Sequence, residues 1–262
     1  MVQQEQLERR FGGLNRLYGE GRLSDLLAAH VMVAGIGGVG SWCVEALARS
    51  GVGRLTLIDM DHISESNINR QLPALGSTIG QSKIEARRQR IWDIHLPCEV
   101  ELGHYVVEAA NIYDYLQRSP DVLVDCTDQV DAKIAMILAA KKQKIKLIVC
   151  GAAGGKRNPL ALKRGDLSQA THDAMLAKLR SRLRKEHGFA RVKAEKVTAK
   201  TRIPKMGVDV LWVEENAVMP AAWQNQIMTP QGLSCAGYGS SVTVTAPMGF
   251  AAAQAALDYL LF

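Results

Sequence analysis

A glycine-rich turn is the first segment of the sequence whose residue types and spacing could do chemistry. The run GIGGVG contains a GxGxxG pattern, made by Gly35, Gly37 and Gly40 with Gly38 beside them. It follows an aliphatic run and opens a helical pattern, where glycines allow a tight turn and a close approach of the backbone to phosphate. Asp59 lies nineteen residues after Gly40 and could accept hydrogen bonds from ribose hydroxyls. The pattern predicts nucleotide binding, but it does not distinguish NAD from ATP.

Charged residues further along the chain favour ATP. Arg70 ends the polar run DMDHISESNINR, and Lys83 begins a helical pattern shortly after it. Both cations could reach a triphosphate, which an enzyme that cleaves one requires and a hydride-transfer enzyme does not. Asp128, in the run DCTD, could hold Mg²⁺ while phosphates fill the other positions. Taken singly, these residues also fit a solvated loop and, for Asp128, a helix N-cap.

The elements that must position these residues alternate along the first part of the chain. Buried strands interleaved with helices predict βαβ units, and therefore an α/β, Rossmann-like, mostly parallel sheet flanked by helices. We expect one domain over 1–262, with a nucleotide-binding core at about 10–155, an irregular basic insertion at about 156–206 and C-terminal strands and a helix at about 207–262. Strands are predicted at 30–35, 54–59, 98–106, 121–126, 145–151 and 208–213, and helices at 38–50, 83–94, 109–118, 131–143 and about 170–187.

Composition limits the class of protein. The chain has 262 residues, 47% of them hydrophobic, which is enough for a large core, and its formal net charge is +6. Its five cysteines are odd in number and none are spaced as CxxC, so we expect neither a disulfide framework nor structural zinc. A reducing, cytoplasmic setting fits best, since the N-terminal residues lack a signal-peptide core. The apolar segment 241–262 is predicted to be a strand followed by a buried helix, with a membrane span as the alternative.

The runs GIGGVG, DMDHISESNINRQ, QSKIEA and VDCTD together resemble the ubiquitin-activating-enzyme-like superfamily, which includes the MoeB and ThiF adenylyltransferases. The resemblance covers most of residues 10–155 and implies ATP and Mg²⁺ as cofactors and a homodimer. In that family an N-terminal arginine, matched here by Arg16, reaches into the ATP site of the partner. The resemblance also implies that Asp59 and Asp61 lie near the ribose, that Asn69, Arg70 and Lys83 bind phosphates, and that Asp128 coordinates Mg²⁺.

A basic segment follows the nucleotide-binding core. Between Lys178 and Lys205 there are eleven Lys or Arg residues against Glu186 and Glu195. Such a run is often a solvated face, but its density beside a nucleotide site favours nucleic-acid binding that weakens with salt. Lys156, Arg157, Lys163 and Arg164 could extend it. The candidate tRNA-binding residues are Lys178, Arg180, Arg182, Arg184, Lys185, Arg191, Lys193 and Lys196.

The runs RFGGLNRLYG and GLSCAGYGS, the basic insertion and the missing zinc cysteines resemble the tRNA threonylcarbamoyladenosine dehydratase family over nearly the whole chain. The resemblance implies ATP-dependent cyclisation of threonylcarbamoyladenosine next to the anticodon, through an acyl-adenylate. It also implies a link to a cysteine desulfurase and its sulfur-acceptor protein, which would give Cys235, in its Gly/Ser-rich loop, a catalytic or sulfur-accepting role. The alternatives are an adenylyltransferase for the C-terminal glycine of a ubiquitin-like sulfur carrier, and an NAD-binding, RNA-associated protein.

Overall fold

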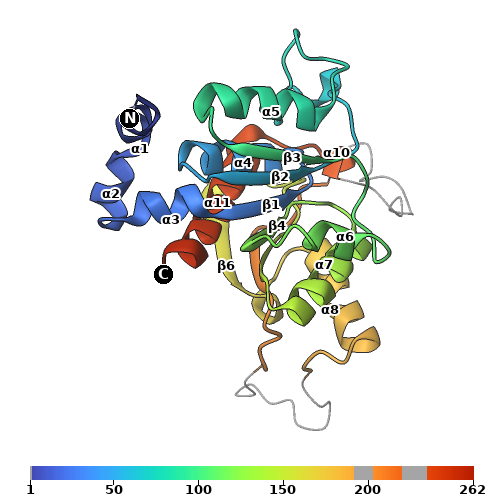
Figure 1. Ribbon diagram of the computed structural model, residues 1–262. Helices are drawn as coiled ribbons and strands as arrows, with labels where there is room; N and C mark the ends of the chain where they lie inside the picture. Colours follow the sequence, from blue (N-terminus) through green and yellow to red (C-terminus); the bar gives the residue numbers. More distant parts are fainter. Residues whose placement is uncertain (1, 192–202, 220–234) are drawn as a thin grey trace.

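The computed structural model describes residues 2–191, 203–219 and 235–262, and its architecture is α/β (Figure 1). A seven-stranded sheet with the strand order β3-β2-β1-β4-β5-β7-β6 forms its centre. Neighbouring strands are parallel, apart from β6, which runs antiparallel to β7. This mostly parallel sheet confirms the predicted fold class. The strands are β1 His30–Ala34, β2 Arg54–Ile58, β3 Glu99–Gly103, β4 Val122–Asp125, β5 Lys146–Cys150, β6 Leu162–Asp166 and β7 Asp209–Val213.

Helices cover both faces of the sheet (Figure 1). One face is covered by α4, α5 and α11, and the other by α6, α7 and α8. The central strands are buried on both faces, which explains why they are almost continuously apolar in the sequence. The helices are α1 Val2–Phe11, α2 Gly13–Tyr18, α3 Arg22–Ala28, α4 Gly40–Arg49, α5 Lys83–Ile94, α6 Ile112–Leu116, α7 Val130–Gln143, α8 Ala174–Glu186, α10 Cys235–Tyr238 and α11 Val242–Leu261.

The prediction of a strand at the start of 241–262 is wrong, because α11 runs through the whole segment. The β-branched run VTVT and Pro247 suggested a strand, but the Ser241 side chain caps the helix by accepting from the N–H of Thr243. Helix α11 packs closely on α4: a Cβ at Gly249 would lie 2.5 Å from the carbonyl oxygen of Val39. Burial in this packing overrides the local β preference. Among the described residues, no helix is long and apolar enough to cross a membrane.

The described residues of the segment 156–206 are more regular than expected. It contributes the edge strand β6, whose charged residues and glycine hide the alternation typical of a strand, and then α8. The side chain of Asp166, at the end of β6, accepts hydrogen bonds from the backbone N–H groups of Ser168, Met206 and Gly207. This part of the chain is therefore joined to the sheet and extends it.

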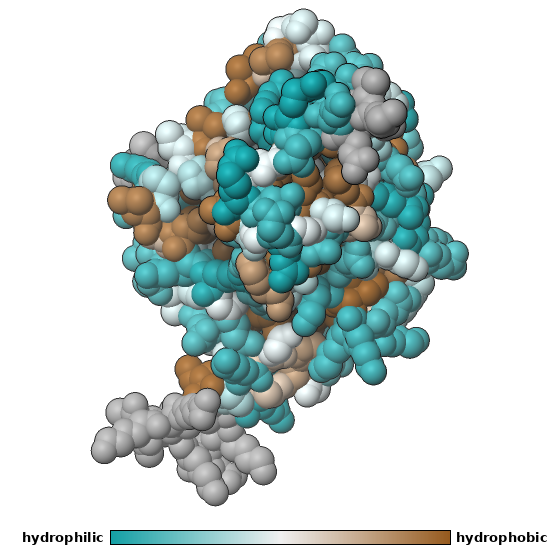
Figure 2. Space-filling view, turned by 60° about the vertical axis from the view of Figure 1, so that its left-hand side comes forward, coloured by the Kyte–Doolittle hydropathy of each residue, from teal (hydrophilic) through white to brown (hydrophobic). Residues whose placement is uncertain are grey.

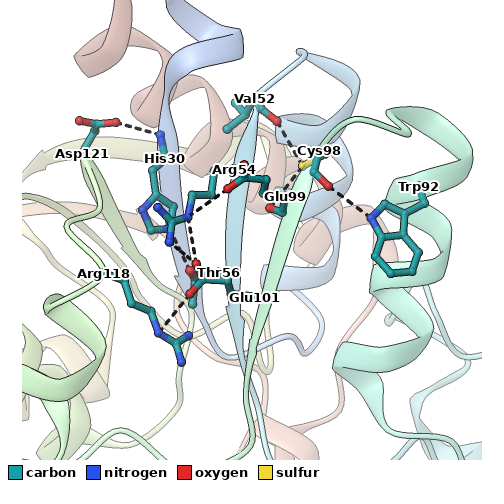
Figure 3. Close-up of polar contacts among 10 residues, drawn as sticks. All are labelled: His30, Val52, Arg54, Thr56, Trp92, Cys98, Glu99, Glu101, Arg118 and Asp121. Carbon is teal, nitrogen blue, oxygen red and sulfur yellow. Dashed lines mark hydrogen bonds and ion pairs between the residues drawn. The ribbon is translucent and has the colours of Figure 1, made fainter.

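A polar cluster fixes the amino ends of the central strands, away from the glycine turn (Figure 3). His30 donates its backbone N–H to Asp121, and its ring Nε2 lies 2.8 Å from the Thr56 hydroxyl. Glu101 on β3 bridges Arg54 on β2 and Arg118, which follows α6. Burial and then the Arg54 charge lower the pKa of His30, so the ring stays neutral at pH 7. The cluster holds β1, β2 and β3 together.

Candidate active site

A cavity of about 370 Å³ lies at the carboxyl edge of the sheet. Its walls include the glycine turn after β1 and the turn after β4, which are the two neighbouring strands whose connections leave in opposite directions. Ligands of doubly wound sheets bind at this switch point. Eight of the predicted site residues line the cavity: Gly35, Gly37, Gly38, Asp59, Asp61, Arg70, Lys83 and Asp128.

The glycine turn needs its glycines. Gly35 has a φ of 84°, and a Cβ there would lie 2.8 Å from the carbonyl carbon of Cys126. Gly40, the first residue of α4, packs so closely on Gly35 that a Cβ would overlap the Gly35 carbonyl oxygen. Gly37 is different, since the nearest atom to its virtual Cβ is 3.9 Å away, on Gln71. Gly35 and Gly40 therefore shape the turn, while Gly37 leaves open space through which a ligand can approach the backbone.

A carboxylate and a lysine meet at the end of β2. Asp59 accepts hydrogen bonds from the backbone N–H of Ile36 at 2.7 Å and of Asp61 at 2.8 Å, so it joins the glycine turn to β2. The buried Lys83, first residue of α5, lies 2.7 Å from Asp61 Oδ2 and 3.9 Å from Asp59 Oδ1. Burial raises the pKa of Asp59, and the Lys83 charge opposes this rise. Lys83 is therefore held at the cavity wall by two acids.

Arg70 is oriented by the loop that precedes it. Its Nη1 donates to the Ser66 carbonyl at 2.8 Å and to Asn69 Oδ1 at 2.9 Å. Its Nε and Nη2 make no hydrogen bond with any described residue. Asn69 Nδ2 donates to the Ser240 carbonyl, and this bond ties the loop to the segment just before α11. Arg70 thus offers donors to a ligand, whereas Asn69 is committed to holding the loop and does not line the cavity.

A buried ion pair supports the turn that carries Asp128. The Asp125 Oδ1 atom accepts from the Thr127 N–H, the Thr127 hydroxyl and Lys133 Nζ, which lies 3.1 Å away. Lys133, on α7, also donates to the Cys150 carbonyl at 2.8 Å and so links β4, β5 and α7. Asp125 and Lys133 are both fully buried. Asp128, in contrast, is exposed at the cavity and has no partner among the described residues.

Other predicted residues lie elsewhere. Arg16 is exposed on α2 and does not line this chain's cavity. In Figure 1, α2 lies beyond the amino end of β1. Gly40 lies behind the turn. Cys235 begins α10, directly after a segment that lies outside the described residues. Lys193 and Lys196 are outside the described residues.

The predicted basic helix is partly neutralised. Arg182 pairs with Asp131 at 2.5 Å and with Glu186 at 2.9 Å, and Arg180 donates to the carbonyls of Leu167 and Ala170. Arg184 donates to the Ala190 carbonyl. On α8 the expected surface is therefore reduced to two exposed lysines that form no ion pair with a described residue, Lys178 and Lys185. Arg191 is exposed beyond the helix.

Two of the suggested extensions of this surface are also engaged within the fold. Lys156 is buried and donates to the carbonyls of His172 and Glu215, and Arg164 pairs with Asp209 and Asp258. Arg157 and Lys163 are exposed.

Sequence reasoning missed Gln71 and Thr245. Gln71 is 6% exposed, lines the cavity, and its Oε1 has no partner among the described residues. Thr245, from the first turn of α11, contacts the same space beside Gly38. The only available signal for Gln71 was its position directly after Arg70. Thr245 gave no signal, because the start of the segment 241–262 was expected to be a strand.

The fold and this cavity define a doubly wound α/β protein with its ligand site at the switch point. The sequence model of the ThiF family matches residues 11–261. The tRNA threonylcarbamoyladenosine dehydratase of Haemophilus influenzae is 40% identical over 262 residues, which are 100% of this chain and 97% of the relative. That of Escherichia coli is 38% identical over 259 residues, 96% and 93% of the two chains. The crystal structure of E. coli tRNA N6-threonylcarbamoyladenosine dehydratase, TcdA, in complex with ATP superposes with a TM-score of 0.84 at 36% identity, covering 97% and 94%. The chain therefore belongs to the ThiF family, in its branch of tRNA threonylcarbamoyladenosine dehydratases.

Proposed function

We propose that this protein catalyses the ATP-dependent dehydration of threonylcarbamoyladenosine next to the anticodon of tRNA, which closes the cyclic oxazolone form. The observation that carries the proposal is the convergence of the glycine turn, Arg70, Lys83 and Asp128 on one cavity at the switch point. The full-length relatives named as dehydratases of this nucleoside supply the substrate. Structures of one relative in complex with ATP and with AMP support ATP as the second substrate.

The first step activates the threonine carboxylate. One carboxylate oxygen attacks the α-phosphorus of ATP, a P–O bond forms, and the bond to pyrophosphate breaks. Negative charge develops on the phosphates, and the fixed cations Arg70 and Lys83 stabilise it in a site partly closed to water. The acids around Lys83 hold its ammonium group in place before the ligand arrives, so little reorganisation is needed.

The second step closes the ring. The ureido oxygen attacks the activated acyl carbon, the ureido nitrogen loses its proton, and AMP leaves. Over both steps the nucleoside loses one water, whose oxygen departs on AMP. Because the attack is intramolecular, positioning alone supplies much of the rate, and no side-chain nucleophile is required. Gln71, with an amide oxygen that has no partner at the cavity wall, is suited to orient the ureido group.

We also propose that Asp128 holds Mg²⁺ together with the phosphates. The fit rests on its exposed, unpartnered carboxylate at the cavity, since Mg²⁺ takes one or two carboxylates and completes its shell with phosphates and water. When bound, the ion neutralises phosphate charge. The buried Asp125, which accepts two hydrogen bonds from Thr127, holds the turn that carries Asp128 at the cavity.

A homodimer completes the proposed site. Arg16 is exposed, has no partner among the described residues and does not line the cavity of its own chain. Its neighbour Leu17 is 71% exposed, and Phe262 is 82% exposed. Apolar residues of this kind form separate patches on the face seen in Figure 2, among hydrophilic ones. We propose that a second copy covers the N-terminal helices and receives Arg16 in its ATP site.

The remaining parts of the proposal concern tRNA and sulfur. We propose that the exposed cations Lys178, Lys185 and Arg191 contact tRNA, while the paired arginines of α8 shape the surface beneath them. Lys193 and Lys196 keep their predicted tRNA-binding role. Cys235 keeps its proposed role as an acceptor of sulfur from a cysteine desulfurase system, for which the start of α10, close to Ser240 in the cavity wall, is a suitable place.

The test uses tRNA that carries threonylcarbamoyladenosine, with ATP and Mg²⁺. After incubation and mild digestion, the modified nucleoside is weighed by mass spectrometry. Loss of one water only when ATP is present is the expected result. An unchanged mass with intact modified tRNA would refute the proposal. It would favour the alternative, an adenylyltransferase for a ubiquitin-like sulfur carrier, which would release pyrophosphate with a protein ending in glycine.

A further inference from the structure

A second cationic region lies at the amino edge of the sheet, away from the cavity described above. Lys141 and Lys142 lie in the last turn of α7, Lys144 caps it, Lys146 begins β5, and Lys205 precedes β7. All five side chains are exposed, and none forms an ion pair with a described residue. We call these five residues the amino-edge lysine surface. Only Lys205 belongs to the basic segment 178–205 noted in the sequence, and the other four lysines precede that segment in the chain.

The lysines surround a hollow. Lys141, Lys146 and Lys205 line a cavity of about 570 Å³ formed by α7, Phe189 beyond α8, Tyr259 on α11 and the edges of β5, β6 and β7. Two acids, Asp166 and Asp209, also line it. Asp166 is engaged with backbone N–H groups, and Asp209 is paired with Arg164 at 2.9 Å. Asp209 is balanced by Arg164, whereas Asp166 keeps its negative charge. The three lysines outnumber the two acids, so the wall of the cavity carries a net positive charge that attracts an anion.

The aromatic residues at this cavity favour phosphate over a nucleobase as the ligand. The ammonium group of Lys141 lies 4.5 Å from the ring centre of Phe189, and that of Lys146 lies 5.0 Å from that of Tyr259. Phe189 is only 7% exposed, so its face is not available to stack on a base. Lysine is a point charge without the planar fork of arginine. A group of lysines therefore recognises the negative charge of phosphates and not the base sequence.

The two ends of α7 connect the proposed substrate cavity to this surface. Gln129 and Ala132, at the start of α7, line the first cavity, and Lys141 lies near its end. A helix of 14 residues is about 21 Å long, which is less than one turn of a nucleic-acid duplex at about 34 Å. Helix α8 packs on α7, and its exposed residues Lys178 and Lys185 offer further positive charge between the first cavity and the amino-edge lysine surface. An RNA with one base in the first cavity is long enough to reach the second region.

We propose that the amino-edge lysine surface binds the sugar–phosphate backbone of the tRNA at a distance from the modified base. The inference rests on the proposed function for the identity of the RNA, and it assigns to the protein a second contact that recognises tRNA by charge. It predicts that binding depends on more of the RNA than the anticodon loop, and that it loses part of its salt dependence when these lysines are removed.

The test variant combines Lys142→Gln, Lys144→Asn and Lys205→Gln. Lys141 and Lys146 are kept because they line the cavity and pack there on Phe189 and Tyr259, whereas Lys142 packs on the exposed ring of Tyr113. Asparagine is chosen at position 144 because Lys144 has a φ of 59°, which asparagine tolerates. The matched control, Arg88→Gln with Arg157→Gln and Lys163→Gln, removes the same charge from α5, from the turn before β6 and from β6.

Binding of unmodified tRNA is measured directly by fluorescence anisotropy at several salt concentrations. The test variant should bind about tenfold more weakly at physiological salt, and its plot of log Kd against log salt should be less steep by about two to three. The control should match the wild type. Equal binding and slope for test variant and wild type would overturn the proposal, and so would equal losses in test variant and control.

Turnover separates this inference from the proposed function. If wild-type protein dehydrates the nucleoside, the test variant should show a raised KM for tRNA, an unchanged kcat and an unchanged KM for ATP. If the wild type removes no water, the proposed function fails, but the anisotropy measurement still decides the lysine contact. Lysine-dependent binding to phosphatidylserine vesicles with no lysine-dependent binding to tRNA would refute RNA as the partner.

Discussion

Replacing Glu45 by glutamine should weaken the link between α4, which follows the glycine turn, and α5, which begins with Lys83. Glu45 lies on α4, the helix that follows the glycine turn, and its side chain is 6% exposed. Its carboxylate accepts from Arg87 at 3.0 Å and from Arg90 at 2.8 Å, both on α5, and from Arg49 at 2.8 Å. Helix α5 begins with Lys83. The ion cluster thus fixes the distance between the glycine turn and Lys83.

The magnitude follows from the ionisation of Glu45. Burial on its own would raise its pKa, but the hydrogen bonds from Arg90 and the charge of Arg87 lower it from 4.5 to about 2. At about 1.4 kcal/mol per pKa unit, ionised Glu45 contributes about 3 kcal/mol to the free energy of unfolding at pH 7. Burial also lowers the pKa of Arg87 to about 10 despite Glu45, so part of that gain is offset by desolvation. We therefore expect Glu45→Gln to cost about 2 to 3 kcal/mol, which is also near the cost of breaking a buried pair.

The assay is urea unfolding of both proteins between pH 7 and pH 3. Because the pKa is lowered in the folded state, the contribution of Glu45 is complete above pH 4.5 and is lost as the pH falls toward 2. The difference between wild type and variant should therefore be largest at pH 7 and shrink below pH 4.5. Glu85→Gln, which removes a half-exposed partner of Arg88 on α5, is the control and should cost under about 1 kcal/mol. A difference that is the same at pH 7 and pH 3 would refute the reasoning.

Three further outcomes are expected. Arg70→Ala should lower ATP-dependent turnover by about a hundredfold or more, as loss of a charge-stabilising donor does, with tRNA binding nearly unchanged; normal turnover would remove Arg70 from the site. Gly40→Ala should abolish nucleotide binding, measured by calorimetry, because a Cβ would overlap the Gly35 carbonyl, whereas Gly76→Ala, with open space around it, should bind normally. Asp125→Asn should lower the free energy of unfolding by about 3 kcal/mol, since Lys133 stays fully buried with a weaker partner; a urea midpoint equal to the wild type would contradict this.

The central sheet was predictable because its strands are buried on both faces. The predicted strand ranges contain β1, β2, β3, β4, β5 and β7, since no other element gives such short aliphatic runs between helical patterns. The site residues of the carboxyl edge were predictable for a related reason: parallel strands end together, so Asp59 and Asp128 had to lie near the glycine turn.

What escaped the sequence depends on tertiary context. The strand β6 lies at the sheet edge with two charged residues facing solvent, so its pattern resembles a loop. The start of α11 is β-branched, and only its burial against α4 decides for a helix. Charge counting placed Arg180 and Arg182 on a free basic face, but both are engaged in bonds within the fold. Counting charges does not reveal which of them are already paired.

The position of α11 has a consequence for how the protein is made. This helix covers β4, β5 and β7 and packs on α3 and α4, yet it is synthesised after all of them. Until α11 has been synthesised, β4, β5 and β7 lack its cover on one face of the sheet, and the wall of the cavity that holds Thr245 is missing. An amino-terminal fragment that ends before residue 242 would thus expose apolar surface and lack a complete pocket. The site can therefore be completed only after α11 has been translated. Until then, the exposed apolar surface makes the nascent chain a substrate for chaperones.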